Sequence, residues 1–295
     1  MRTALVFGGS GQIGRPLLDR LVAAGWHVDA VSRDPPRDVA GVRWRRGDLA
    51  RLEGMPAAVD AIVSCGPLDH FARWFGASPI ECKRVVAFGS TSVAVKHDSG
   101  DAQERDIAMR LHAAENSLFA SARVQGAAVT VLRPTLVYGV GRDRTLSRIA
   151  ALARSAGLFV LPRGACGLRQ PVHVDDLADA AVAALDSEAA HGRAYDLPGG
   201  ETLSYREMVA RVLAALQPPA RLIELPAPLF AAMLRVARAT GRMHGFGDAA
   251  LARMREDLVF DSAPSQRDFG YAPRAFAPTA AMFEADSLPP LKKGD

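Results

Sequence analysis

The sequence is poor in cysteine, lysine and tyrosine, and it has no long apolar run. Its 295 residues hold 3 cysteines, at positions 65, 82 and 166. This odd, scattered set excludes a fully paired disulfide framework and shows no zinc-type spacing, so we expect no metal site. No stretch reaches the roughly eighteen consecutive apolar residues of a membrane span. At this length we expect two structural units or one large α/β domain.

Charge of one sign is not in large excess either. The 36 basic and 32 acidic residues leave a net charge of +4, which is weak for a nucleic-acid-binding protein but suits a phosphorylated small molecule. One basic segment with an aromatic residue is formed by Arg43, Trp44, Arg45 and Arg46. A strand beside a cofactor is a simpler interpretation of this segment than a nucleic-acid-binding surface. We expect a cytoplasmic protein, because no signal-peptide pattern follows Met1. We also expect a monomer or homodimer that acts on a small-molecule substrate.

Short apolar runs alternate with helical patterns in the first half of the chain. Strands are predicted at residues 3–8, 27–31, 42–46, 59–64, 84–88 and 129–132, and helices at 13–25 and 101–124. This alternation is typical of an α/β fold with a doubly wound parallel sheet.

After residue 139 the pattern becomes more helical. Helices are predicted at 143–155, 175–185 and 205–216. Ser204 and Glu207 form a capping box at the start of the last helix. A strand predicted at 193–197 could return to the sheet. The apolar segment 225–237 is too short to span a bilayer. A helix facing the core of a smaller lobe is favoured there over a membrane-surface or partner helix.

A glycine-rich turn links the first strand to the first helix, with Gly8, Gly11 and Gly14 spaced three apart. In a dinucleotide site the first glycine permits the turn, the second lets the backbone approach the pyrophosphate, and the third allows close helix packing. The helix N-terminus offers free N–H groups to the phosphates. The residues expected to hold the cofactor here are Gly8, Ser10, Gly11, Gln12, Ile13 and Gly14. A purely structural turn is the alternative.

These features predict a Rossmann-type domain over residues 1–140, to which 171–200 return. Residues 141–170 and 201–295 are expected to form a smaller, partly interlaced C-terminal substrate lobe.

The end of the second strand bears on the choice between NAD and NADP. An NAD site usually places an acidic residue there, but Asp29 lies inside the strand and Asp34 falls after the expected position. Ser32 and Arg33 suit a 2′-phosphate instead. We expect NADP rather than NAD, unless Arg33 is only a solvated surface residue.

Further motifs follow the glycine turn in order. They are Gly47–Leu49 (GDL), Ser64–Gly66 (SCG), Phe88–Ser92 (FGSTS), Leu132–Gly139 (LRPTLVYG), His173–Ala178 (HVDDLA), Tyr195–Gly200 (YDLPGG) and Asp268–Pro273 (DFGYAP). Together they resemble the short-chain dehydrogenase/reductase superfamily, in its extended, NAD-dependent epimerase/dehydratase branch. The resemblance covers nearly the whole chain. It implies that Asp48, Leu49, Ser64, Cys65, Gly66 and Pro134 contact the cofactor.

The catalytic motif of that family is missing. The family uses a tyrosine followed four positions later by a lysine, with a glutamate four further on. Aligning on Glu115 places Ile107 at the tyrosine position and Leu111 at the lysine position. The tyrosines are Tyr138, Tyr195, Tyr205 and Tyr271, and the lysines are Lys83, Lys96, Lys292 and Lys293, so no pair has the required spacing. The chain is thus an atypical member by this resemblance.

Other residues could carry the chemistry. Thr91 aligns with the family's catalytic hydroxyl, although its hydroxyl could simply be satisfied by backbone. Tyr138 lies in the loop expected beside the nicotinamide, where it could be a replacement acid or an aromatic packing residue. Candidates for the substrate cleft are Ser90, Ser92, Arg142, Arg169 and His173, although His173 could instead cap the next helix.

Two functions remain open from the sequence. The first is an NAD(P)-binding oxidoreductase or epimerase-like enzyme with non-standard acid–base residues, acting on an unidentified small molecule. The second is a catalytically idle NADP-binding sensor or scaffold protein, in which Ile107 and Leu111 merely continue an apolar helix face. The enzyme is favoured.

Overall fold

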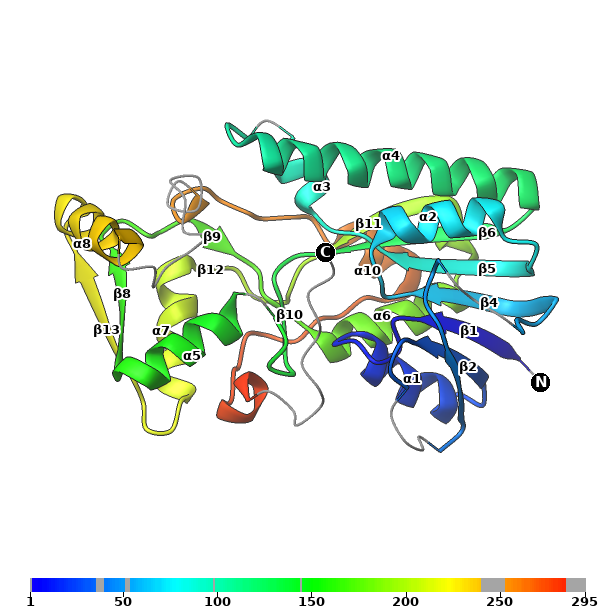
Figure 1. Ribbon diagram of the computed structural model, residues 1–295, viewed down its shortest axis with the longest axis horizontal. Helices are drawn as coiled ribbons and strands as arrows, with labels where there is room; N and C mark the ends of the chain where they lie inside the picture. Colours follow the sequence, from blue (N-terminus) through cyan, green and yellow to red (C-terminus); the bar gives the residue numbers. More distant parts are fainter. Residues whose placement is uncertain are drawn as a thin grey trace.

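The computed structural model describes residues 2–35, 40–50, 54–97, 99–143, 145–239 and 253–284, with backbone only for 236–239. Its main feature is a parallel sheet in the order β11-β6-β5-β4-β1-β2-β3 (Figure 1). The strands are β1 Thr3–Phe7, β2 His27–Ser32, β3 Val42–Arg46, β4 Ala58–Ser64, β5 Glu81–Phe88, β6 Ala128–Pro134 and β11 Arg193–Leu197. The predicted α/β parallel sheet is confirmed. Its order reverses between β1 and β4, and ligands of such sheets bind beyond the carboxyl ends of the strands at this point.

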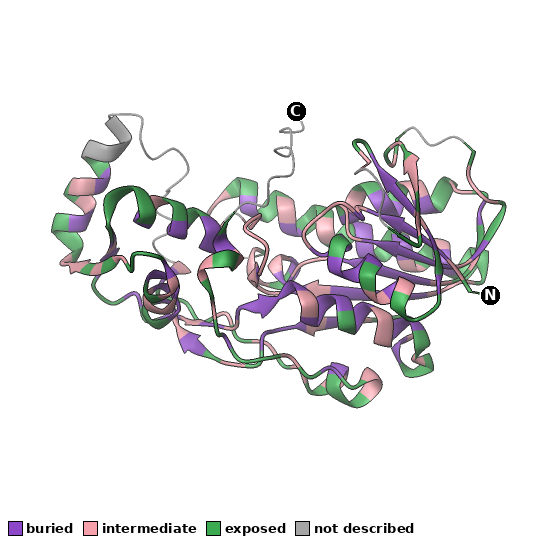
Figure 2. Cartoon of the chain, turned by 90° about the horizontal axis from the view of Figure 1, so that it is seen from below, coloured by how far each residue is buried: buried purple, intermediate pink, exposed green. Residues whose placement is uncertain are grey.

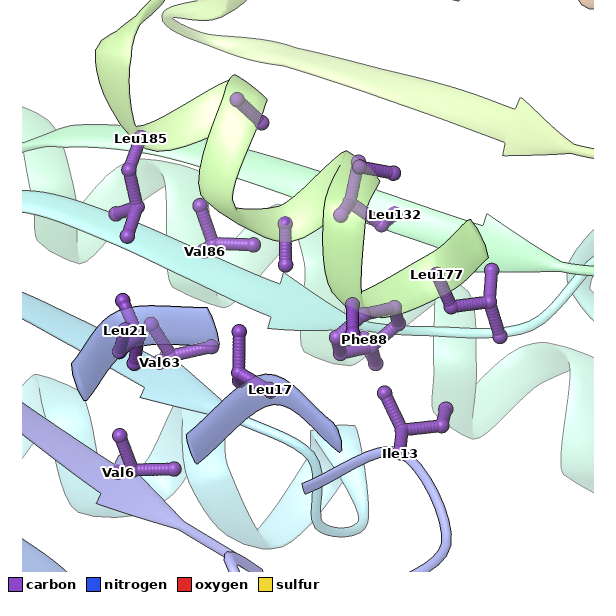
Figure 3. Close-up of a cluster of buried hydrophobic side chains, with 14 of the residues drawn as sticks. Val6, Ile13, Leu17, Leu21, Val63, Val86, Phe88, Leu132, Leu177 and Leu185 are labelled. Atoms are coloured by element: carbon purple, nitrogen blue, oxygen red, sulfur yellow. The ribbon is translucent and has the colours of Figure 1, made fainter. Parts of the chain in front are cut away.

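Helices cover both faces of the sheet. On one face lie α1 (Gly14–Ala23) and α6 (Val174–Asp186), and on the other α2 (Leu68–Ala77) and α4 (Ala102–Gln125) (Figure 1). Leu17 and Leu21 of α1 and Leu177 of α6 meet the valines of the sheet in one buried cluster (Figure 3). The buried phenylalanines of α2 form the core of the opposite face. Parallel strands buried on both faces explain the near-continuous apolar runs of the sequence.

A smaller lobe lies at the far end of the molecule from the sheet (Figure 1). It contains α5 (Leu146–Ala156), β8 (Leu158–Pro162), α7 (Tyr205–Ala215), β13 (Arg221–Leu225) and α8 (Ala227–Ala239). These elements enclose most of a third buried cluster, and β8 pairs in parallel with β13. The helix expected over 225–237 is α8, which buries Phe230 and Leu234.

Short strands and turns join the two parts. The strand β7 (Val137–Tyr138) pairs with β10 (Val172–His173), and β9 (Leu168–Arg169) with β12 (Leu203–Ser204). Shorter helices are α3 (Ser92–Val95), α10 (Ala263–Phe269) and the single turns Glu188–Ala190 and Ala280–Phe283.

Burial follows this architecture. The strands at the centre of the sheet are buried, whereas the outer faces of the helices are exposed (Figure 2). In the described part of the chain, no helix combines the length and the apolar character needed to cross a membrane.

Candidate functional site

The glycine-rich turn connects β1 to α1 beside the end of β4. Gly8 has φ +72°, and a Cβ there would lie 3.1 Å from the carbonyl carbon of Cys65. The turn closes through a hydrogen bond from Gly11 N to Gly8 O at 2.9 Å. A Cβ on Gly14 would lie 2.1 Å from Gly8 O, so only glycine lets the helix pack this closely. The local geometry therefore requires glycine for the turn at Gly8 and for the close packing at Gly14.

Several features of this turn suit a dinucleotide. No side chain among the described residues caps the N-terminus of α1, and no acidic residue lies in its first turn. Within the described residues, the buried Ser64 Oγ and Gln12 Oε1 have no hydrogen-bond partner. Among the described residues, a Cβ on Gly11 would meet only Gly8 O within 4 Å, which leaves open space above this part of the turn. Free N–H groups, open backbone and unpaired polar atoms are what a pyrophosphate and its ribose require.

The end of β2 brings two serines together. Ser32 is buried, and its Oγ lies 3.1 Å from Ser10 Oγ in the glycine turn. Arg33 is exposed. Asp29 forms ion pairs with Arg43 and Arg45, which hold the pKa of its carboxyl below the ordinary value although burial opposes them. The Asp29 carboxylate is thus paired with arginines of β3 and does not reach the end of β2. The polar side chains at the end of β2 are those of Ser32 and Arg33.

The other predicted cofactor residues follow β3 and β4. Asp48 Oδ1 accepts a hydrogen bond from Ala50 N at 2.8 Å. Leu49 packs against the cluster that contains Phe71, and a Cβ on Gly66 would lie 4.0 Å from its Cδ1. Burial raises the pKa of Cys65 to about 12, so its thiol stays protonated and is a poor nucleophile.

The hydroxyl residues after β5 are bonded to one another and to β6. Thr91 is 7% exposed, and its Oγ1 donates to the carbonyl of Pro134 at 3.3 Å. Ser90 Oγ donates to Ser92 Oγ at 3.1 Å. The backbone partner for Thr91 matches the alternative weighed above, and it leaves the hydroxyl's lone pairs able to accept one further hydrogen bond.

Helix α4 carries no polar pair at the positions of the missing motif. Ile107 and Leu111 are half-buried, and Leu111 packs against the apolar cluster beneath α2 and α4. One turn after Leu111, Glu115 is 4% exposed and forms a bidentate ion pair with Arg133 of β6. The ion pair anchors α4 on the sheet.

Tyr138 lies in the core of the smaller lobe. It is 1% exposed and packs edge-on against His173 and Phe276 at ring-centroid distances of 5.1 and 4.9 Å. Burial raises the pKa of its phenol to about 12. This placement favours the packing role over that of a proton donor, since the phenol is enclosed by protein.

His173 and Arg169, expected in the substrate cleft, are both buried. His173 Nδ1 accepts the backbone N–H of Asp175 at 3.1 Å and so caps α6, as its motif suggested. Arg169 donates to the carbonyls of Leu168, Arg253 and Glu256 and lies over the ring of Tyr205. Both side chains tie segments of the structure together rather than lining an open surface.

Arg142 takes a position that sequence reasoning did not foresee. It follows β7 in the loop that leads to the smaller lobe, yet its Nη1 donates to the carbonyl of Ser10 in the glycine turn at 2.8 Å. Spacing could not indicate this contact, because 132 positions separate the two residues.

A second unforeseen group joins α3 to α4. Lys96 Nζ lies 3.8 Å from Glu104 Oε1, and Arg253 also contacts Glu104. Burial, helped by Arg253, lowers the pKa of Lys96. Nothing in the sequence marks this cluster, which links the smaller lobe to the helix that lacks the family motif.

Comparison with known proteins finds a matching family profile, similar sequences and a similar fold. Residues 77–197 match the sequence profile described as the NAD dependent epimerase/dehydratase family. The chain is 28% identical over 316 residues to a 2-alkyl-3-oxoalkanoate reductase of Stenotrophomonas maltophilia, an alignment that spans 92% of this chain and 94% of that protein.

Two further similarities are informative. The chain is 25% identical over 251 residues to the mitochondrial NADH dehydrogenase (ubiquinone) 1 alpha subcomplex subunit 9 of Arabidopsis thaliana, across 78% of this chain and 62% of that protein. A UDP-glucuronic acid 4-epimerase from Bacillus cereus, in complex with NAD, superposes with a TM-score of 0.68 at 12% identity over 96% of this chain and 97% of that one.

Proposed function

Because residues 77–197 match the profile of the NAD-dependent epimerase/dehydratase family, we propose that this chain is an NADP-dependent oxidoreductase acting on a small molecule. One observation carries the proposal: the glycine turn keeps open backbone and unpaired polar atoms at the head of an uncapped helix. Ser10 and Ser32, with Arg33 beside them, support NADP as the cofactor. When bound, the nicotinamide supplies or accepts the hydride.

The substrate class follows the full-length similarity. A relative that aligns over 92% of this chain and 94% of its own length is named 2-alkyl-3-oxoalkanoate reductase, so a ketone is the first class to test. Reduction of a ketone needs a hydride at carbon and a proton at oxygen. Positioning of the two partners accounts for much of such a rate enhancement, so the reaction can proceed without the usual tyrosine.

Thr91 is the one predicted catalytic candidate that we keep. Its O–H is directed to Pro134, so it can accept but not readily donate a hydrogen bond to a substrate or cofactor. We assign the proton of the reaction to water, since Tyr138 is enclosed in the smaller lobe and Ile107 and Leu111 carry no proton.

A cofactor-binding protein without catalysis is the second candidate. It is favoured by the apolar environment of Leu111 in α4 and by the similarity to a protein named as a subunit of a larger complex. Such a protein needs the glycine turn but no acid–base group.

A turnover assay separates the two candidates. The purified protein is mixed with NADPH or NADH and a panel of 2-substituted 3-oxo acids, simple ketones and nucleotide sugars, and loss of reduced nicotinamide is followed. We expect turnover with NADPH and a ketone that disappears in Gly11→Val. Tight NADPH binding without turnover across the panel would favour the idle protein.

Variants of the two catalytic candidates refine the assay. Thr91→Val is expected to lower kcat/KM by about 2- to 10-fold, the worth of one neutral hydrogen bond. Tyr138→Phe should leave turnover nearly unchanged. A drop of about a hundredfold or more would make the phenol the general acid and overturn our assignment of the proton to water.

A further inference from the structure

Arg142 is a half-buried cation with no acidic partner among the residues that the structure describes. Within the described residues, the Arg142 side chain donates one hydrogen bond, to Ser10 O, and it forms no ion pair with a carboxylate. The neighbouring carboxylate of Asp143 is already engaged, because it accepts the N–H groups of Thr145 and Ser147 at the start of α5. A desolvated charge is costly unless an opposite charge compensates it.

The loop that carries Arg142 is held at several points. Gly141 N donates to Met282 O at 2.8 Å, and Asp143 caps the first turn of α5. Before it, Gly139 packs so closely on His173 that a Cβ would lie 2.7 Å from the ring nitrogen Nε2. The smaller lobe therefore positions the guanidinium against the glycine turn.

Two positive elements consequently converge on the same turn. The N-terminus of α1 has the positive end of the helix dipole, no capping side chain and no acid in its first turn. Arg142 reaches the same turn from the opposite lobe and, with one N–H on Ser10 O, still has four donors to offer. Like charges placed together without a counter-ion favour an anion between them, and a guanidinium binds phosphate oxygens in a fork.

We propose that Arg142 binds the pyrophosphate of the dinucleotide, so that the smaller lobe completes the cofactor site. This inference rests on the proposed function. The pyrophosphate is favoured as the bound anion because Arg142 donates to a backbone carbonyl of the turn itself. The side chain of the same Ser10 lies 3.1 Å from Ser32 Oγ at the end of β2, so the comparison of NADPH with NADH decides between the pyrophosphate and the 2′-phosphate. Binding of the cofactor then also fastens the two lobes together.

The test is the affinity of the full chain for NADPH and for NADH, measured by calorimetry in wild type and two variants. Arg142→Ala removes the whole group, and Arg142→Gln keeps an N–H for Ser10 O but removes the charge. Both should weaken NADPH and NADH alike by about 10- to 150-fold, as expected for a hydrogen bond to a charged group. Arg221→Ala, which removes an exposed arginine from β13, is the matched control and should change neither affinity.

Each other outcome has a distinct meaning. Unchanged affinities in folded Arg142→Gln would overturn the inference and leave Arg142 as a contact between the lobes. A loss confined to NADPH would also overturn it, because Arg142 would then bind the 2′-phosphate. If the wild type binds neither dinucleotide, the proposed function itself fails. This outcome differs from the first two, because both of those require a wild type that binds a dinucleotide.

Discussion

Gly11 and Gly14 lie in the same turn but have different surroundings. A Cβ on Gly11 would meet a single atom, Gly8 O at 3.0 Å, whereas one on Gly14 would also press on Gly9 Cα at 2.7 Å. We therefore expect Gly11→Val to abolish dinucleotide binding in a folded protein, because its side chain takes the space of the phosphate. Gly14→Ala should lower the free energy of unfolding by about 1–3 kcal/mol.

Calorimetry and urea denaturation of the two variants check this prediction. Unchanged affinity in Gly11→Val would remove the glycine turn from the cofactor site.

Arg33 tests the choice of dinucleotide. It is exposed at the end of β2, where Asp29 is engaged by Arg43 and Arg45. Arg33→Asp should erase or reverse the preference for NADP, since it removes a charge-assisted hydrogen bond worth roughly 1.5–3 kcal/mol. The affinities of NADPH and NADH are compared in wild type and variant. A wild type that binds NADH as tightly as NADPH would make Arg33 an ordinary surface residue.

At the scale of an element, the N-terminus of α6 depends on a neutral histidine. His173 Nδ1 accepts the N–H of Asp175, a role that the protonated ring cannot fill. Burial lowers the pKa of His173 from 6.5, and nearby Arg274 acts in the same direction, while the carboxylate of Asp175 opposes them. The folded protein thus resists protonation more than the unfolded chain does.

The stability of the protein should therefore depend on pH through this cap. The contribution of His173 is fully present above its unfolded pKa of 6.5, and it is lost as the pH falls through the lower folded pKa. His173→Asn supplies another good N-cap that does not titrate. Urea denaturation of both proteins between about pH 8 and pH 5 should show a smaller loss of stability in the variant. An identical pH dependence in both would contradict the prediction.

At the scale of the whole molecule, the C-terminal segment connects the two parts of the fold. Tyr271 is buried in the cluster of the sheet and donates to Pro198 O, while Phe276 is buried against Tyr138 in the smaller lobe. Between them, Arg274 pairs with Asp176 of α6. This segment therefore holds the smaller lobe beside the sheet.

Phe276→Ala should destabilise the protein by about 3–5 kcal/mol, because it leaves a cavity beside Tyr138. The urea midpoint measures the loss, with Leu229→Ala as the control, since Leu229 is 57% exposed on α8. A loss no larger than that of the control would show that the segment does not support the lobe.

The order of apolar runs determined most of the sheet. The strands of the first half and the helices α1 and α4 follow from alternating periodicity, because buried parallel strands and amphipathic helices carry distinct patterns. The pattern allowed β11 to return to the sheet, and the structure pairs it with β6. The glycine spacing likewise located the turn and its uncapped helix. The strands β8 and β13 were not predicted, since short apolar runs have no distinctive period. The helix α2 was also not predicted, although its buried residues have the i, i+3, i+4, i+7 spacing of one helix face.

Tertiary structure alone decided the surroundings of each polar side chain. The sequence left Tyr138 open between a proton donor and a packing residue and made Arg142 a candidate for the substrate cleft. Packing of the smaller lobe buries Tyr138 and brings Arg142 to Ser10. Lys96, Glu104 and Arg253 likewise meet only when the lobes fold together. Local periodicity is a property of neighbouring residues, whereas burial and pairing depend on segments that are distant along the chain.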